Sequence, residues 1–389
     1  MARLGDICEK VTDYVASGSF AALKENVLIT NEENYAIMVK TADFSNGFTK
    51  ALTYTDKRGY DFLKNSNLFG GELILSNIGS IGKVFKVPYL DRPMTLASNT
   101  VMIKTATPEL TDYLYYYFLS PAGYKSLLSI SSGTSMLKFN KTELKKLEIP
   151  IPDIDKQRRI IAVMDKVSNL ISLRKQQLAK LDELVKARFV EMFGGIHDSK
   201  MYPYKLVNDL TDVISGGTPS RDVNEYWEGG TIPWVKTTEL QNNYVTEVEE
   251  YITEEGLNNS SAKIVPAGTV LIAMYGQGKT RGMTAYLGIE ACTNQACACI
   301  LPSDKINQTF LWQFFVLSYD NLRNRAKGGN QPNLNGNIIK NYPVLYPPIE
   351  LQEQFAAFVK QTDKSKVAVQ KALDEAQLLF DSLMQKYFE

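Results

Sequence analysis

The chain has 389 residues, enough for two or three domains, and 44% hydrophobic with 22% charged residues is the composition of a globular protein. Basic and acidic residues are equal in number, 43 of each, so any nucleic-acid-binding surface must be local. The start, MARLGDICEKV, carries acidic residues where a secretion signal needs an apolar core, and no apolar run approaches the roughly 18 residues of a membrane span. We therefore expect a cytoplasmic location.

Residues 1–150 are expected to form a β-rich domain. Short apolar runs such as YAIMVK, ELILSNI and NTVMIK are separated by Gly, Asn and Pro, which is typical of strands and turns. A single helix is predicted late in the domain, over TDYLYYYFLSPAGYKSLL from Thr111. Its dense aromatics are interpreted as core residues and not as a surface for base stacking.

A long helix is predicted over residues 151–195. Apolar residues recur at steps of three and four from Ile160 to Met192, which is the stripe of a coiled coil. Pro152 suits the entry to this helix, and Gly194 and Gly195 end it. About 40 residues at 1.5 Å each give a length of roughly 60 Å.

The rest of the chain repeats this plan with an offset of about 195 residues. VKTADF from Val39 recurs as VKTTEL from Val235, GELILSNIGS from Gly71 as GTVLIAMYGQ from Gly268, and IPIPDIDKQRRI from Ile149 as VLYPPIELQEQF from Val344. A second β-rich domain is therefore expected over residues 196–346, again with one late helix from Thr309, and a second long helix over residues 347–389.

The two stripes share one register, which predicts that the long helices pair with each other. Because the copies are in tandem, the simplest closed arrangement is an antiparallel coiled coil with pseudo-twofold symmetry, with the domains at opposite ends of a helical spacer. Arg174 and Arg188 interrupt the first stripe and are candidates for setting the register or contacting another subunit. The residues expected to pair are Ile160, Met164, Val167, Ile171, Leu178, Leu181, Val185, Phe355, Val359, Val369, Leu373, Phe380 and Leu383.

Residues for catalysis are scarce. His197 is the only histidine, which excludes His-based triads and His metal clusters. The stretch AMYGQGKT from Ala273 resembles a phosphate-binding loop, but the residues after Thr280 predict strands and turns, whereas such a loop must open into a helix. YPPI from Tyr346 lacks the amide or acid before the prolines and the aromatic after them that an adenine methyltransferase tetrapeptide has. Pro152-Asp153 is not followed by the rest of a nuclease motif.

The four cysteines do not predict a metal site or a disulfide framework. Cys297 and Cys299 alternate as strand residues do, and Cys292 adds a third thiol without a nearby fourth ligand. We expect buried structural cysteines, no metal and no catalytic residues in this chain.

The tandem plan resembles the specificity (S) subunit of type I restriction-modification systems. The resemblance is carried by a proline followed five residues later by glutamine at the start of each long helix, by SGGTPSRDVNEYWEGGTIPWVKTTEL from Ser215, and by GGNQPNLN from Gly328 with its weaker counterpart SGTSMLKFN from Ser132. It implies an α+β fold with two target-recognition domains, each reading one half of a bipartite site in double-stranded DNA, and paired helices that set the spacer.

The resemblance also implies partners. Two methyltransferase (M) subunits, which bind S-adenosylmethionine, would dock on the helices, and motor-nuclease (R) subunits would complete the complex. This chain would bind no cofactor itself. The alternative is the specificity component of a type IIB-like or methyltransferase-only system.

Base-reading residues cannot be carried over from the family, because recognition domains differ where sequence is read. Arg, Lys, Asn and Gln in Gly-rich loops can bond guanine or adenine edges, or phosphates. The candidates chosen on this ground, with neighbouring hydroxyls, are Lys57, Arg58, Lys83, Thr134, Ser135, Lys138, Arg221, Lys236, Lys279, Arg281, Lys327, Asn330, Gln331 and Asn333.

Overall fold

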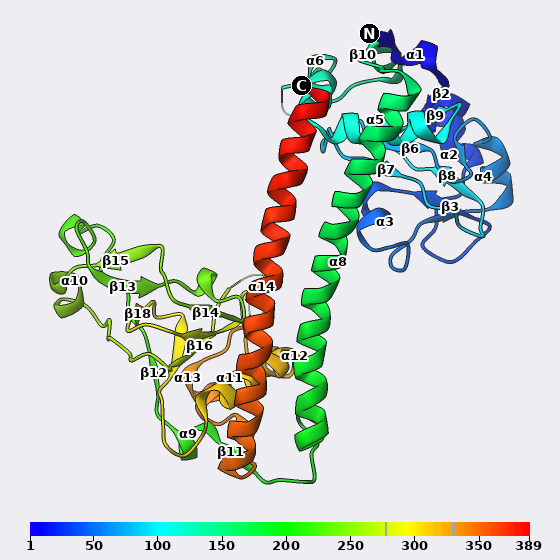
Figure 1. Ribbon diagram of the computed structural model, residues 1–389. Helices are drawn as coiled ribbons and strands as arrows, with labels where there is room; N and C mark the ends of the chain where they lie inside the picture. The colour runs from blue at the N-terminus through cyan, green and yellow to red at the C-terminus, as the bar shows by residue number, and fades with distance from the viewer. Residues whose placement is uncertain (135, 277, 329–331) are drawn as a thin grey trace. The chain divides into compact units, whose positions relative to one another are not determined.

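The computed structural model describes residues 1–134, 136–276, 278–328 and 332–389, and it divides into two compact units (Figure 1). Unit 1 is Met1–Lys175 with Lys371–Glu389, and unit 2 is Gln176–Gln370. The long helices are α8 (Ile154–Phe193) and α14 (Ile349–Phe388), each of 40 residues. Each unit thus combines one predicted domain with half of each long helix, because the helices pack directly on the domains.

Unit 1 contains two four-stranded sheets and several short helices. Its elements besides the long helices are β1 (Ala2–Arg3), α1 (Leu4–Ile7), β2 (Cys8–Asp13), η1 (Tyr14–Ser17), α2 (Phe20–Asn26), β3 (Ala36–Val39), α3 (Thr41–Ser45), β4 (Tyr54–Thr55), α4 (Lys57–Phe62), β5 (Asn67–Leu68), β6 (Leu73–Ser76), β7 (Val84–Lys86), β8 (Met94–Leu96), β9 (Thr100–Thr105), α5 (Pro108–Leu119), α6 (Pro121–Ser129), α7 (Lys141–Lys146) and β10 (Glu148–Ile149).

The sheets of unit 1 have the orders β2-β9-β6-β7 and β4-β3-β8-β5. The first is antiparallel throughout, and the second contains one parallel pair, β3 with β8. β1 pairs with β10, which joins the two ends of the domain. Ile160 and Met164 of α8 and Met384 of α14 enter the same apolar core as α5, so the helix halves belong to this core.

Unit 2 repeats this arrangement. Its elements besides the long helices are β11 (Tyr204–Leu206), α9 (Val207–Leu210), β12 (Val213–Ser215), η2 (Asn224–Tyr226), β13 (Ile232–Val235), η3 (Thr237–Glu239), β14 (Asn243–Val245), β15 (Glu250–Ile252), α10 (Glu254–Asn258), β16 (Val270–Ala273), β17 (Thr284–Leu287), β18 (Cys292–Thr293), β19 (Cys297–Ile300), α11 (Gln308–Leu317), α12 (Tyr319–Asn324), α13 (Gly336–Lys340) and β20 (Pro343–Leu345).

Its sheets have the orders β12-β19-β16-β17-β14 and β15-β13-β18, and β11 pairs with β20. The correspondence with unit 1 is close: β16 lies between β17 and β19 as β6 lies between β7 and β9, and β13 pairs in parallel with β18 as β3 does with β8. The three cysteines of this unit are buried in β18 and β19. The internal repeat predicted from the sequence is therefore a repeat of topology.

The prediction of one late helix in each domain was wrong. In unit 1 the segment forms two helices, α5 and α6, because the Ser120 side chain accepts a hydrogen bond from the Gly123 amide (3.1 Å) and Pro121 occupies the first turn of α6. In unit 2 the break falls at Ser318, between α11 and α12. The second helix of each pair, α6 in unit 1 and α12 in unit 2, leads into one of the loops described below.

Within each unit the two long helices run antiparallel, as predicted. In unit 2 Asp182 pairs with Lys366 (2.7 Å), and Phe189 further along α8 meets Phe355 earlier in α14 (ring centroids 5.5 Å apart). In unit 1 Val167 and Ile171 cluster with Ala376. All thirteen residues expected to pair are buried or half-buried. Among the described residues, no helix is both long and apolar enough for a membrane span.

Candidate nucleic-acid interface

Two loops meet at one end of the five-stranded sheet of unit 2. The first, called here glycine turn 2, connects β16 to β17, and the second, late loop 2, connects α12 to α13. The Leu334 amide donates to the Met274 carbonyl (3.0 Å), and the Arg281 guanidinium donates to the Pro332 carbonyl. Lys327 and Asn333 close late loop 2 with reciprocal backbone hydrogen bonds of 3.0 and 2.9 Å. The two loops therefore form one surface.

Unit 1 has the same junction. Glycine turn 1 connects β6 to β7, and late loop 1 connects α6 to α7. The Gly79 amide donates to the Leu137 carbonyl (3.0 Å), and the Phe139 amide to the Asn77 carbonyl (3.1 Å). Ser132 and Lys138 close late loop 1 as Lys327 and Asn333 close its counterpart. The repeat thus produces a paired-loop surface in each unit.

Seven of the eleven candidate residues that the structure describes lie on these surfaces. In unit 2 Lys279 and Lys327 are exposed, whereas Arg281 and Asn333 are half-buried. In unit 1 Lys83, Thr134 and Lys138 are exposed. Exposed ammonium and hydroxyl groups on adjoining loops can donate hydrogen bonds to phosphate oxygens or base edges. Three further candidates, Ser135, Asn330 and Gln331, lie outside the described residues.

Two candidates of unit 1 lie on a different element. Lys57 and Arg58 begin helix α4, away in the chain from both loops of the surface. The Lys57 ammonium pairs with Asp61 (2.8 Å), and that hydrogen bond raises the pKa of Lys57. Arg58 donates to the Asn26 side chain (2.9 Å). Both side chains are exposed but are already engaged within the domain.

Arg221 and Lys236 belong to an internal ion-pair cluster around Glu250. Glu250 lies 2.6 Å from Arg221 and 2.9 Å from Lys236, and Lys236 also bonds Glu249 (2.7 Å). The Arg221 guanidinium lies 3.6 Å from the ring centroid of Trp227, a cation–π contact. Through these contacts, both cations stabilise the segment around β13 and β15.

The pKa values in this cluster follow from the pairing. Hydrogen bonds to Glu249 and Glu250 raise the pKa of Lys236 to about 12. Burial acts to raise the pKa of Glu250, but the hydrogen bonds from Lys236 and Arg221 outweigh it, so the net shift is downward. Lys236 and Glu250 are therefore both charged at neutral pH.

Sequence reasoning missed Tyr319 and Arg323 of α12, which contact glycine turn 2. The Tyr319 hydroxyl donates to the Lys279 carbonyl (2.6 Å), and Arg323 donates to the Gly278 carbonyl (2.8 Å). Their spacing of four residues places them on one face of a helix. That spacing does not reveal that their acceptors are backbone carbonyls some 40 residues earlier in the chain.

The elements around AMYGQGKT are not those of a phosphate-binding loop. The segment follows β16, and the chain continues into strand β17, as predicted, so no helix N-terminus stands behind Lys279 and Thr280. Lys279 is exposed on the turn. Among the described residues, no group of three or more His, Cys, Asp or Glu side chains could hold a metal ion.

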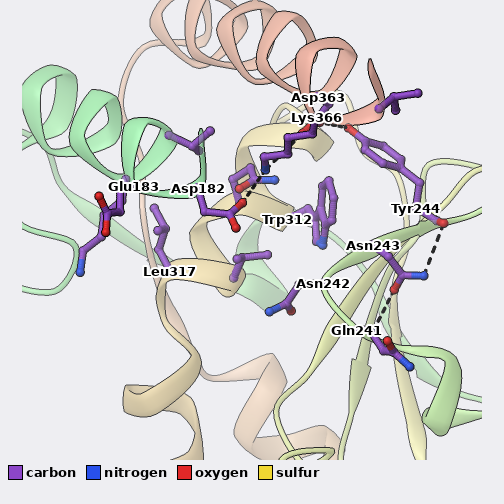
Figure 2. A pocket seen from close by; sticks show the side chains of 15 residues that line it. Asp182, Glu183, Gln241, Asn242, Asn243, Tyr244, Trp312, Leu317, Asp363 and Lys366 are labelled. Atoms are coloured by element: carbon purple, nitrogen blue, oxygen red, sulfur yellow. Dashed lines mark hydrogen bonds and ion pairs between the residues drawn. The ribbon is translucent and has the colours of Figure 1, made fainter. Parts of the chain in front are cut away.

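A pocket of about 670 Å³ lies in unit 2 between α8, α11, α14 and β14 (Figure 2). The Lys366 ammonium points toward Asp182 and also lies 3.5 Å from Asp363, whose carboxylate accepts a hydrogen bond from the Tyr244 hydroxyl (3.0 Å). Burial, with the charge of Asp363, raises the pKa of Tyr244, which keeps the hydroxyl protonated. Both aspartates are thus paired with Lys366: Asp182 joins α8 to α14, and the hydrogen bond between Asp363 and Tyr244 joins α14 to β14.

Comparison with known proteins gives a consistent result. The family model described as "Type I restriction modification DNA specificity domain" matches residues 1–183 and 202–376. The chain is 24% identical over 235 residues to the EcoR124I/EcoR124II specificity subunit of Escherichia coli, a match that covers 56% of each chain. It is 22% identical over 382 residues to the MjaVIII specificity subunit of Methanocaldococcus jannaschii, covering 90% of this chain and 86% of the relative.

A shorter match reaches 30% identity over 172 residues with the MjaIX specificity subunit of M. jannaschii, covering 42% of this chain and 38% of that one. The matches to the E. coli subunit and to the MjaIX subunit therefore span about half of the length of those chains or less.

Two solved structures share the fold. A chain from a structure of the assembly and conformational transition of the type I restriction-modification system aligns with a TM-score of 0.56 and 16% identity, covering 100% of this chain and 97% of that one. The S subunit from M. genitalium aligns with a TM-score of 0.51 and 16% identity, covering 98% and 96%. With the repeated domains, the repeated loop surface and the family match over both copies, the chain belongs to the family of type I restriction-modification specificity subunits.

Proposed function

We propose that this chain reads a bipartite DNA site, one half with each paired-loop surface, and that it does so without catalytic residues of its own. The observation that carries the proposal is the duplication: glycine turn and late loop are hydrogen-bonded together in both units, with exposed cations in each. Two similar but non-identical surfaces suit a site whose halves differ in sequence. Phosphate contacts would position each domain, and side chains on the loops would specify bases.

The long helices supply the remaining parts of the proposal. A continuous helix of 40 residues is stiff, so the paired helices would fix the distance between the two half-sites. They also expose apolar side chains at equivalent positions of the repeat: Leu184 in α8 and Leu379 in α14, 195 residues apart, are each 48% exposed. Equivalent exposed leucines fit two copies of one partner, and we assign this role to two methyltransferase subunits.

The partners would supply the chemistry. Each methyltransferase subunit would bind S-adenosylmethionine, and motor-nuclease subunits would join to cleave unmethylated DNA. The equal numbers of basic and acidic residues in this chain fit such a division, because the partner subunits would add phosphate contacts around the duplex.

The test is selection from a randomised DNA pool. The chain is co-expressed with the methyltransferase subunit of its own genome, and the purified complex is used to enrich bound duplexes. The expected result is one bipartite motif with a fixed spacer. Replacing residues 200–345 with another recognition domain should change one half of that motif only; enrichment of no motif, or a change in both halves, would overturn the proposal.

A further inference from the structure

Helix α12 holds glycine turn 2 through its backbone carbonyls. Arg323 donates from Nη2 to the Gly278 carbonyl (2.8 Å) and from Nη1 to the Arg281 carbonyl (2.5 Å), with a longer contact from Nη1 to the Lys279 carbonyl (3.4 Å). The Tyr319 hydroxyl donates to the same Lys279 carbonyl (2.6 Å). Carbonyl groups from three residues of one turn therefore converge on two side chains, which we call the Tyr319–Arg323 clamp.

The two side chains of the clamp also contact each other and lie close to the turn. The Arg323 guanidinium lies 5.1 Å from the Tyr319 ring centroid, and its Nη1 also lies 3.0 Å from the Tyr319 hydroxyl. Gly282 has a positive φ of 87°, and a Cβ there would lie 3.0 Å from Arg323 Cγ. A side chain at residue 282 would therefore be strained and would push α12 away from the turn.

The turn is also tied on its other side. Arg281 donates to the Pro332 carbonyl of late loop 2, so glycine turn 2 is held between α12 and that loop. Lys279, whose carbonyl is taken up by the clamp, has an exposed side chain. With the backbone held on both sides, the point at which the Lys279 side chain leaves the turn is defined.

We propose that Arg323 is a positioning residue for sequence recognition by unit 2: it touches the turn and not the DNA, and it sets where Lys279 meets the duplex. This inference rests on the proposed function. The planar guanidinium suits the role, because its fixed fork of donors can bond several carbonyls at once, whereas a lysine ammonium offers a single flexible point. Pre-ordering the turn also lowers the entropy that binding would otherwise cost.

Unit 1 provides an internal control. There the ring of Tyr124 on α6 covers glycine turn 1, since a Cβ on Gly82 would lie 2.4 Å from that ring. The contact is made by an aromatic ring, with no hydrogen bond from Tyr124 to the turn among those of the described residues. Loss of Arg323 should therefore affect only the half-site that unit 2 reads.

The experiment measures binding of the co-expressed methyltransferase complex to its selected site and to single-base variants of each half. For Arg323→Ala, discrimination should fall about 10-fold or more at the half-site of unit 2 and stay unchanged at the other. The discrimination of Arg323→Lys should lie between those of the wild type and Arg323→Ala. Tyr319→Phe should lose less discrimination than Arg323→Ala. Lys305→Ala is the charge control, since it removes a cation of unit 2 that lies outside both loops, where the ammonium donates to the Asp209 carbonyl (3.3 Å).

A double-mutant cycle separates positioning from direct contact. Lys279→Ala should weaken binding in the wild type but have little further effect in Arg323→Ala, because the clamp acts through the turn. Additive losses, or equal losses for Arg323→Ala and Lys305→Ala, would overturn the inference. If Arg323→Ala lowers the unfolding temperature, the Arg323→Lys and Tyr319→Phe variants carry the same test. A wild-type complex that selects no motif would instead overturn the proposed function.

Discussion

Single residues in unit 2 show how the same residue type serves either surface or framework. Lys279 and Lys327 are exposed on the paired loops, whereas Lys236 and Arg221 are bonded to Glu250. All four stood out in the sequence for the same reason, a cation near glycines. Sequence could not separate them, because the partner acids Glu249 and Glu250 reach Lys236 only through the pairing of β13 with β15.

Glu250 should contribute measurable stability to unit 2. Glu250→Gln removes the charge that Arg221 and Lys236 share and should cost about 1 kcal/mol at pH 7. The three tryptophans, Trp227, Trp234 and Trp312, all lie in unit 2, so urea unfolding followed by their fluorescence reports this unit. Glu247→Gln, at an exposed position, is the control and should leave the transition in place.

The wild type and Glu250→Gln should also differ in their response to acid. The folded pKa of Glu250 is below its ordinary value of 4.5, so its contribution is complete above that value and is lost as the pH falls through the folded pKa. The difference between wild type and Glu250→Gln should therefore shrink below about pH 4.5. A difference that grows on acidification would contradict the assignment.

The entry of each long helix is fixed by a glutamine that reaches back to a proline. The side-chain amides of Gln157 and Gln352 donate to the carbonyls of Pro152 and Pro347, both at 2.8 Å. This bond gives the physical reason for the repeated proline–glutamine spacing, which the sequence presented only as a family signature. The Gln352 carbonyl oxygen also accepts from the Asn307 amide (2.9 Å), whereas the Gln157 oxygen is buried without such a partner.

The two glutamines should therefore differ in their contribution to stability. Gln352→Ala leaves a buried amide and a buried carbonyl unpaired and should cost about 2–3 kcal/mol, seen by tryptophan fluorescence in urea. Gln157→Ala breaks one bond and should cost about 1 kcal/mol, seen by far-ultraviolet circular dichroism. Equal losses, or a larger loss at Gln157, would contradict this account of the helix entries.

The long helices were predictable because their apolar stripe repeats over 40 residues, but the stripe alone missed part of their packing. The predicted stripe runs through Arg188 and Met192, yet the next residues, Phe189 and Phe193, are the ones fully buried among aromatics of the domain, including Phe310. The stripe finds the contact between helices, whereas the contact between helix and domain needs the fold. The split of each late helix was missed similarly, since a serine cap inside an apolar run leaves the periodicity intact.

The exposed leucines of the helices should bind partners and contribute little to folding. Leu184→Asp should leave the urea transition nearly unchanged, while Phe189→Ala, a few residues on, should cost about 3–5 kcal/mol. In a complex with the methyltransferase, Leu184→Asp or Leu379→Asp alone should reduce the stoichiometry from two subunits to one. The double variant should retain none, as measured by light scattering; two bound subunits in the double variant would refute the docking assignment.

At the scale of the whole chain, the duplication explains most of what could be predicted. Matching VKTADF with VKTTEL located equivalent strands, and the structure shows why both carry an acid: the Lys40 and Lys236 amides donate to Asp43 and Glu239 (2.7 and 2.8 Å). The candidate residues for reading DNA were less predictable, because a loop's glycines indicate a turn but not which side chains face outward.

The proposed spacer role of the helices predicts a change in geometry without a change in sequence recognition. Four residues inserted after Leu178 in α8, with four inserted near Val369 in α14 to keep the antiparallel pairing, lengthen the spacer by about 6 Å. The selected site should then show a spacer longer by about two base pairs, with both half-sites unchanged. Altered half-sites at the original spacing would contradict this role.

The central claim, that this chain alone chooses a bipartite DNA site for methylating partners, is tested most directly by mapping methylated bases across the host genome with and without the gene for this chain. The account predicts one asymmetric, two-part motif that is methylated in the wild type and unmethylated in the deletion, and restored when the chain is supplied again. A methylation pattern that is identical in both strains, or loss of a motif without a gap between two halves, would contradict it.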